Sequence, residues 1–298
     1  VGPIAMGLAQ AYLRTGDADQ LAALEDAGDL LLNKTGNFSP SDGYLAYQLD
    51  AIFGGTTYSD YVFDNYYTLL ANGEYDRNGA DTNYDTAEYV AAVRAGRSGS
   101  QANMAAWDLG MGLYAAQLAG ADTTAWVAGV EAELNEMTDG YYDVIGLAGA
   151  LMGLSAAGVD FDPTSGVFAD ADNLSELAET LASFQLSTGG FVWNQNYVIE
   201  SDGNETVQET AYATLALAEF NYALYGNAIA NAQDYLESVQ LGTGGWQNYA
   251  GSGENNELTG EALWALAAPV PEPATMSVLG LGLLGIAVRS IKKRLAKS

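Results

Sequence analysis

The chain contains no cysteine and no histidine among its 298 residues. The lack of cysteine excludes disulfides, thiol nucleophiles and thiolate metal sites. The lack of histidine removes the commonest general base and the commonest zinc ligand. Together the two absences exclude Ser-His-Asp hydrolysis, zinc sites built from Cys and His, and lyases that depend on His.

Positive charge is also scarce, because 38 Asp and Glu outnumber 10 Lys and Arg and give a formal net charge of −28. The body of the chain holds only five basic residues, namely Arg14, Lys34, Arg77, Arg94 and Arg97. Such an acidic body repels polyanions, so we expect no nucleic-acid partner. The hydrophobic share of 49% is nevertheless ample for a core, which argues against an acidic disordered chain.

The other five basic residues follow an uncharged run, from Ala274 to Val288, near the C-terminus. As a helix the run would span roughly 22 Å, which is less than the roughly 30 Å of a bilayer core. The basic residues behind it favour a membrane anchor that leaves the body outside the cytoplasm. The alternative is a buried C-terminal helix of the globular domain.

The run is directly preceded by Pro271, Glu272 and Pro273. The C-terminal segment therefore has an ordered pattern of Pro-Glu-Pro, apolar segment and basic end. Over residues 270–294 this pattern resembles the PEP-CTERM sorting signal of Gram-negative bacteria. The resemblance implies export, an exosortase-type membrane enzyme that recognises the Pro-Glu-Pro, and transient anchoring in the inner membrane by one hydrophobic helix. It also implies removal of the tail and a place at the cell surface or in the exopolysaccharide matrix.

Two boundaries follow from this interpretation. We expect a helical domain over residues 1–268 and a sorting segment over residues 269–298. Because the sequence begins with Val1 and shows no signal peptide, we also expect a signal and some domain sequence upstream.

Apolar residues recur at helical spacing throughout the body, and proline is rare. Together with frequent N-cap residues, this pattern predicts an all-α domain. The expected helices cover residues 3–15, 18–33, 41–54, 57–71, 85–96, 101–119, 123–137, 142–157, 173–186, 205–221, 226–240 and 257–268.

The body also contains an internal repeat, in which residues 183–191 match residues 238–246. Each copy contains Gln-x-x-x-Gly-Gly-aromatic and leads to an Ala-rich helix. The glycines permit a sharp reversal and the aromatic ring can fasten the loop to the next helix pair. The Gln amide could cap free groups at a helix end.

This unit resembles the repeats of the α/α-toroid superfamily, which includes squalene–hopene cyclases and protein prenyltransferases. The resemblance implies an α/α toroid of helical hairpins. Alternation assigns residues 3–15, 41–54, 101–119, 142–157, 205–221 and 257–268 to an inner ring. The first inner helix then lacks an outer partner, so we expect an N-terminally incomplete toroid with a gap beside residues 3–15.

The activities found on toroids can be compared with the residues present. A triterpene cyclase needs an Asp-x-Asp-Asp acid, whereas residues 170–173 lack the last Asp, and Asp172 fits an N-cap instead. The zinc of prenyltransferases needs Cys and His. A glycoside hydrolase needs only two carboxylates. Near the starts of the inner helices, the candidate catalytic acids are Asp42, Asp108, Asp143, Glu209 and Glu261.

Each of these acids also fits a simpler role, because a first-turn acid stabilises the helix dipole. Trp107, Tyr141 and Gln208 lie beside them and are candidate sugar-binding residues. No cofactor is required and no dedicated metal site is predicted, although the acidic loops at 76–81 and 160–172 could bind Ca²⁺.

Three interpretations remain open. The leading one is an exported, surface-sorted protein that associates with extracellular polysaccharide as a binding or structural component. The second is a glycoside hydrolase of the same fold, with a carboxylate pair at the barrel mouth. The third is a cyclase-like enzyme, which the missing acid motif disfavours.

Overall fold

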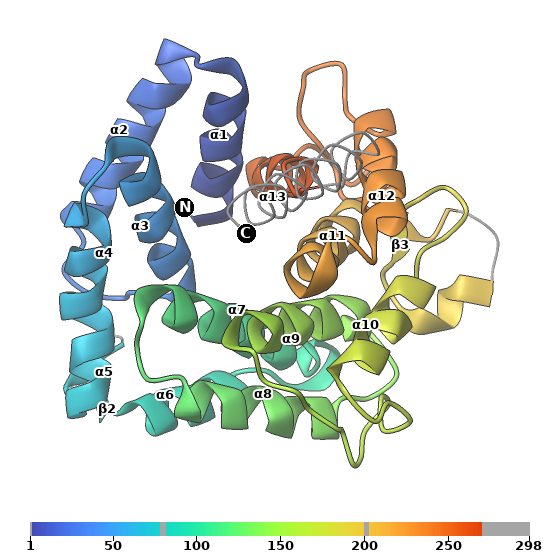
Figure 1. Ribbon diagram of the computed structural model, residues 1–298, viewed down its shortest axis with the longest axis horizontal. Helices are drawn as coiled ribbons and strands as arrows, with labels where there is room; N and C mark the ends of the chain where they lie inside the picture. The colour runs from blue at the N-terminus through green and yellow to red at the C-terminus, as the bar shows by residue number, and fades with distance from the viewer. Residues whose placement is uncertain (1, 78–81, 200–202, 270–298) are drawn as a thin grey trace, which may run out of the picture.

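A computed structural model describes residues 2–77, 82–199 and 203–269 of the chain, and this part is mostly helical (Figure 1). Every helix predicted for the body is present within a few residues of its expected bounds, the fourth as three consecutive segments. The anchor helix predicted within residues 271–298 lies outside the described residues. The domain boundary at residues 268 and 269 stays a prediction.

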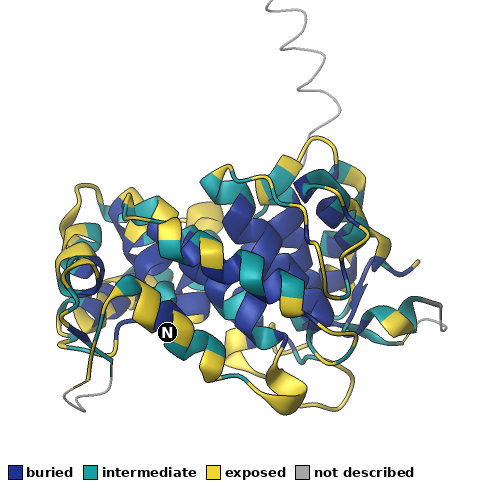
Figure 2. Ribbon diagram, turned by 90° about the horizontal axis from the view of Figure 1, so that it is seen from below, coloured by how far each residue is buried: buried dark blue, intermediate teal, exposed yellow. Residues whose placement is uncertain are grey.

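Six helices form an inner set, and they are the six that alternation assigned to it. Each packs against the next in chain order, and the last packs against the first. A helix that is apolar on all sides is stable only when it is enclosed, and the ninth helix buries every residue from 143 to 154. Buried residues accordingly gather in the middle of the molecule (Figure 2). The inner helices are α1 (Gly2–Thr15), α3 (Pro40–Phe53), α7 (Met104–Ala119), α9 (Asp143–Ala157), α11 (Val207–Asn221) and α13 (Asn256–Leu266).

The remaining helices lie around the outside of the inner set (Figure 1). A π-helical segment, Phe63–Tyr67, joins two of them, and a 3₁₀ turn, Gly99–Gln101, precedes α7. The outer helices are α2 (Ala18–Leu32), α4 (Thr57–Val62), α5 (Thr68–Asn72), α6 (Thr86–Ala95), α8 (Thr124–Glu136), α10 (Leu174–Ser183) and α12 (Gly226–Ser238).

Helices α7 and α9 run parallel, and glycines bring their backbones together. A Cβ added at Gly146 would lie 2.6 Å from the carbonyl oxygen of Asn103, and one added at Gly149 would lie 2.6 Å from the Cα of Trp107. The residue numbers of the contacting positions thus increase in the same direction on α7 and on α9, as they do in parallel helices. The starts of these helices therefore lie at one end of the inner set.

The gap expected beside the first helix is absent, so that prediction is wrong. Helix α1 packs directly on α13, where a Cβ at Gly7 would lie 2.5 Å from the Cα of Gly260. The Arg14 guanidinium also donates to the carbonyl oxygen of Leu266. Two facing glycines let the backbones approach closely, which joins the first inner helix to the last.

Two small antiparallel strand pairs were not predicted, because two-residue strands leave no periodic pattern. Strand β1 (Tyr75–Asp76) pairs with β2 (Asn83–Tyr84), and β3 (Phe191–Val192) pairs with β4 (Glu205–Thr206). The second pair holds a loop that contains a 3₁₀ segment, Gln195–Ile199, beside the start of α11.

The repeated loops have the same backbone geometry in both copies. Gly189 and Gly244 adopt φ of 92° and 93°, and the Gln four residues earlier donates to each glycine's carbonyl oxygen at 2.8 Å. The Gln side chains therefore close their own loops, whereas we had expected them to cap helix ends. The rings of Phe191 and Trp246 are buried, as the predicted fastening of each loop requires.

Candidate functional site

A cavity of about 570 Å³ opens at the starts of α9 and α11. Three loops supply its aromatic lining: the turn before α9, the segment between β3 and β4, and the loop between α12 and α13. We call this cavity the aromatic cleft. Its aromatic lining residues are Tyr141, Tyr142, Trp193, Tyr197 and Tyr249.

Four of these rings follow one another in a row. The ring centroids of Tyr141 and Trp193 lie 5.1 Å apart at 30°, and those of Trp193 and Tyr197 lie 4.7 Å apart at 34°. Tyr142 extends the row at 6.4 Å from Tyr141. These rings are tilted against one another and together form an apolar surface with polar edges.

Tyr142 is held in the left-handed backbone region, with φ of 64° and ψ of 17°, at the N-cap of α9. This conformation is costly for a residue with a bulky side chain, and such residues concentrate at functional sites. It turns the chain into α9 directly after Tyr141, so that both rings line the cleft.

Glu209 lies in the first turn of α11 and lines the cleft, although only 3% of the residue is exposed. The Thr206 hydroxyl donates to its carboxylate. Burial raises the pKa of Glu209 to about 7, and the nearby charge of Asp143 adds to the rise. The cleft thus contains a carboxyl group that exchanges its proton near neutral pH.

Asp143, the first residue of α9, is fully buried beneath the loop between β3 and β4. Its two oxygens accept the backbone N–H of Gln195 at 3.3 and 3.4 Å. Burial raises the pKa of Asp143 to about 6, against the lowering effect of these backbone donors. Asp143 lies behind the cleft lining, and its charge acts on the carboxyl of Glu209.

Glu261 on α13 lies deeper, between the inner helices. The Tyr212 hydroxyl donates to its Oε1 at 3.2 Å and the Gln208 amide donates to the same oxygen at 3.4 Å. Burial raises the pKa of Glu261 to about 8, and the charges of Glu257 and Glu209 add to the rise. Trp107 packs edge-on against Tyr212, with ring centroids 5.2 Å apart. The side chains of Gln208 and Trp107 thus contact Glu261 and Tyr212 between the inner helices, and they do not line the cleft.

The raised pKa of Glu261 predicts the pH dependence of stability. The folded protein keeps this proton between about pH 4.5 and pH 8, where the unfolded chain has lost it. The free energy of unfolding should therefore fall as pH rises through this range. Glu261→Gln mimics the protonated carboxyl and should therefore reduce the decrease in the free energy of unfolding with rising pH.

We expect Glu261→Gln to match the wild type at pH 5 and to exceed its stability at pH 9 by on the order of 2 kcal/mol. Urea unfolding at several pH values measures this difference. The control is Glu237→Gln, which removes one negative charge at an exposed position of α12. Parallel pH curves for the two variants would contradict the assignment.

Two of the candidate acids serve other parts of the fold. Asp42 accepts the Ser39 backbone N–H and the Lys34 ammonium group, each at 2.7 Å, and so caps α3. Asp108 forms a two-point ion pair with Arg97, at 2.6 and 3.0 Å, in a separate cavity. The first-turn acids therefore do not converge on one opening, and of the eight candidates only Tyr141 and Glu209 line the aromatic cleft.

Sequence reasoning missed Tyr142, Trp193, Tyr197 and Tyr249 as cleft residues. A signal for Trp193, Tyr197 and Tyr249 was present, because the segments that follow the two Gly-Gly-aromatic motifs are rich in Trp, Tyr and Asn. Asn248 shows how such a segment is placed, since its side-chain oxygen accepts the backbone N–H of Gln208 at 3.0 Å. The loop thereby reaches the start of α11.

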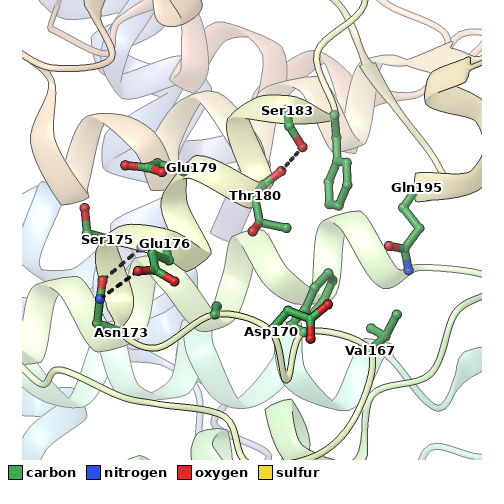
Figure 3. A pocket seen from close by; sticks show the side chains of 12 residues that line it. Val167, Asp170, Asn173, Ser175, Glu176, Glu179, Thr180, Ser183 and Gln195 are labelled. Atoms are coloured by element: carbon green, nitrogen blue, oxygen red, sulfur yellow. Dashed lines mark hydrogen bonds between the residues drawn. The ribbon is translucent and has the colours of Figure 1, made fainter.

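A larger hollow, of about 640 Å³, runs along the outer face of α10 (Figure 3). Three of its polar side chains form hydrogen bonds within the helix or at its cap. Asn173 accepts the Glu176 backbone N–H at 3.0 Å and donates to the Glu176 carboxylate at 3.3 Å, and Ser183 donates to the carbonyl oxygen of Thr180 at 2.7 Å. Asn173, not Asp172 as predicted, is the N-cap of α10. This hollow lacks an exposed row of rings, so we favour the aromatic cleft.

Within the described residues, no group of three or more Asp or Glu side chains could hold a metal ion. In the acidic loop at 160–172, Asp160 instead accepts the backbone N–H of Leu174 at 2.7 Å. The other predicted calcium loop, at 76–81, lies partly outside the described residues.

Comparison with known proteins identifies the C-terminal segment, because the PEP-CTERM protein-sorting motif matches residues 269–294. The tail is a PEP-CTERM motif. Proteins that carry a PEP-CTERM motif are exported, processed by an exosortase and sorted to the cell surface. The PEP-CTERM match covers the tail alone and assigns no family to the helical body. Among curated proteins, none matches the chain.

Among residues 2–77, 82–199 and 203–269, every helix is too short or too polar to span a bilayer. The apolar run of the PEP-CTERM segment, from Ala274 to Val288, lies outside these residues.

Proposed function

We propose that this protein is a surface-sorted glycan-binding protein, and that the aromatic cleft holds the sugar. The observation that carries the proposal is the row of four rings beside the buried carboxyl of Glu209. The apolar faces of pyranose rings pack on aromatic rings, while their hydroxyls need nearby polar groups. The sorting motif supplies the location, because an exported surface protein meets extracellular polysaccharide.

The ligand that fits best is a neutral glycan. The net charge of −28 disfavours a polyanionic chain. Glu209, with a pKa of about 7, can donate or accept a hydrogen bond to a sugar hydroxyl near neutral pH. The proposed partners are therefore the exosortase, the inner membrane before processing, and the neutral polysaccharide of a Gram-negative cell surface.

We further propose that the helical body is an α/α toroid. Six inner helices that pack in cyclic order, an outer helix set and two Gly-Gly loops with matching φ values and hydrogen bonds support this assignment. The fold itself indicates no activity, since one fold hosts many functions.

Truncation of a cleft ring should weaken sugar binding. We expect Trp193→Ala to raise the Kd for the preferred neutral oligosaccharide about 10-fold or more, because stacked rings dominate such contacts. Affinity electrophoresis of the full chain in gels that contain neutral polysaccharides measures this effect. Tyr222→Ala removes an aromatic ring that is more exposed than Trp193 and does not line the cleft, and should leave mobility unchanged. Equal retardation of both variants would contradict the proposal.

A second candidate function is glycoside hydrolysis at the same cleft. It is favoured by one observation, the carboxyl of Glu209 in the cleft lining with the buried carboxyl of Asp143 behind that lining. Burial raises the pKa of Glu209 to about 7 and that of Asp143 to about 6. A hydrolase would release reducing ends, and Glu209→Gln would abolish release while binding persists. A binding protein would release none, whichever acid is changed.

A further inference from the structure

A separate cavity of about 410 Å³ lies between the start of α3, helices α6 and α8, and the first turns of α7. Two of the five cations of the acidic body, Arg77 and Arg97, line it. We call it the arginine pocket. Its size lies within the range of small-molecule sites, roughly 300–1,000 Å³.

Each arginine has a defined setting. The Arg77 guanidinium lies over the Tyr89 ring, 5.4 Å from the centroid, which holds the cation against an apolar surface. Arg97 is bound to Asp108 through two hydrogen bonds. The Asp108 carboxylate is thereby fixed in position, while its remaining lone pairs can accept further donors.

A third group in the lining has an unused hydrogen-bonding function. Trp126 is 1% exposed and lines the pocket, and among the described residues its indole Nε1–H has no hydrogen-bond partner. The Nε1–H is sealed inside the protein, so the Trp126 ring contributes an apolar part of the pocket wall.

We propose that the arginine pocket binds a small hydroxy-carboxylate, such as a uronic acid. Arg77 binds the ligand carboxylate, Asp108 accepts hydrogen bonds from ligand hydroxyls, and the ring of Trp126 packs on the apolar face of the ligand. A pocket that offers both a cation and a carboxylate selects a molecule that carries both an acid and hydroxyls. This site is distinct from the aromatic cleft and does not depend on the function proposed for it.

The test is calorimetric titration of the full-length protein with sodium glucuronate, glucose and sodium acetate. We expect glucuronate to bind about 10-fold or more tightly than either of the other two, because each lacks one of the two recognised groups. Glucuronate also has a glycosidically blocked form, the methyl glycoside. Both compounds carry the carboxylate and differ at the anomeric carbon. Tighter binding of the compound with a free anomeric hydroxyl would indicate a free monosaccharide, and tighter binding of the glycoside would indicate a terminal sugar of a glycan.

Arg77→Gln should weaken glucuronate binding about 10-fold or more, and Arg77→Lys less, because a lysine keeps the charge but not the planar fork. Arg94→Gln is the matched control, since Arg94 pairs with Glu133 and Glu136 away from this pocket. Absence of glucuronate binding, or equal binding by wild type and Arg77→Gln, would overturn the proposal. So would loss of glucuronate binding in Trp193→Ala, which would place the acid in the aromatic cleft.

Discussion

Replacement of Pro271, Glu272 and Pro273 by alanine is expected to keep the full-length chain uncleaved and membrane-bound in an exosortase-bearing host. The matched sorting motif includes these three residues, and the sequence pattern assigns them to the processing enzyme. Behind them lie an uncharged run and five basic residues, which should hold an unprocessed chain in the inner membrane. The surface-exposed, shortened form should be lost almost completely.

Cell fractionation and the mass of the surface-released protein measure this outcome. Lys297→Ala lies outside the matched residues 269–294 and should be processed like the wild type. Release of the same shortened product by the triple-alanine variant would show that the motif does not direct processing.

The second large effect is expected at the contact between α7 and α9. Gly110→Ala should lower the free energy of unfolding by about 3 kcal/mol, because an added methyl group has no room in a closely packed interior. A Cβ at this position would lie 2.6 Å from the backbone nitrogen of Ala150 and would also meet the backbone of Gly149. Neither helix can move without disturbing the other inner helices packed on it.

Urea unfolding of Gly110→Ala against the wild type measures the change. Gly242→Ala is the matched control, because a Cβ there would have no heavy atom within 4 Å and the backbone is not left-handed. The control should alter the free energy of unfolding by less than about 1 kcal/mol. Similar losses in both variants would contradict the close helix contact.

The helices of this protein could be predicted because their signals are local. Apolar spacing and N-cap residues predicted their approximate positions. The closure of α1 on α13 could not be predicted, because residues 7 and 260 form it across the whole length of the body. Nothing near either glycine in sequence indicates its partner.

The candidate site was predicted less well, for a different reason. Asp42, Asp108, Asp143, Glu209 and Glu261 occupy similar places at the starts of helices, yet only tertiary neighbours decide their roles. Arg97 neutralises Asp108, whereas Asp143, Glu209 and Glu261 face no basic partner among the described residues and burial raises their pKa values. The aromatic cleft was missed because its rings come from irregular loops, whose course depends on β3, β4 and Asn248.

The central claim is that the aromatic cleft holds a glycan, and oxidative footprinting with and without a bound neutral oligosaccharide tests it most directly. Four exposed tyrosines form a matched set: Tyr141 and Tyr249 in the cleft are 58% and 61% exposed, and Tyr47 and Tyr222 elsewhere are each 49% exposed. We expect the sugar to protect Tyr141, Tyr249 and Trp193 from oxidation and to leave Tyr47 and Tyr222 unchanged. Bound sugar that leaves the three cleft residues as reactive as before would contradict the account.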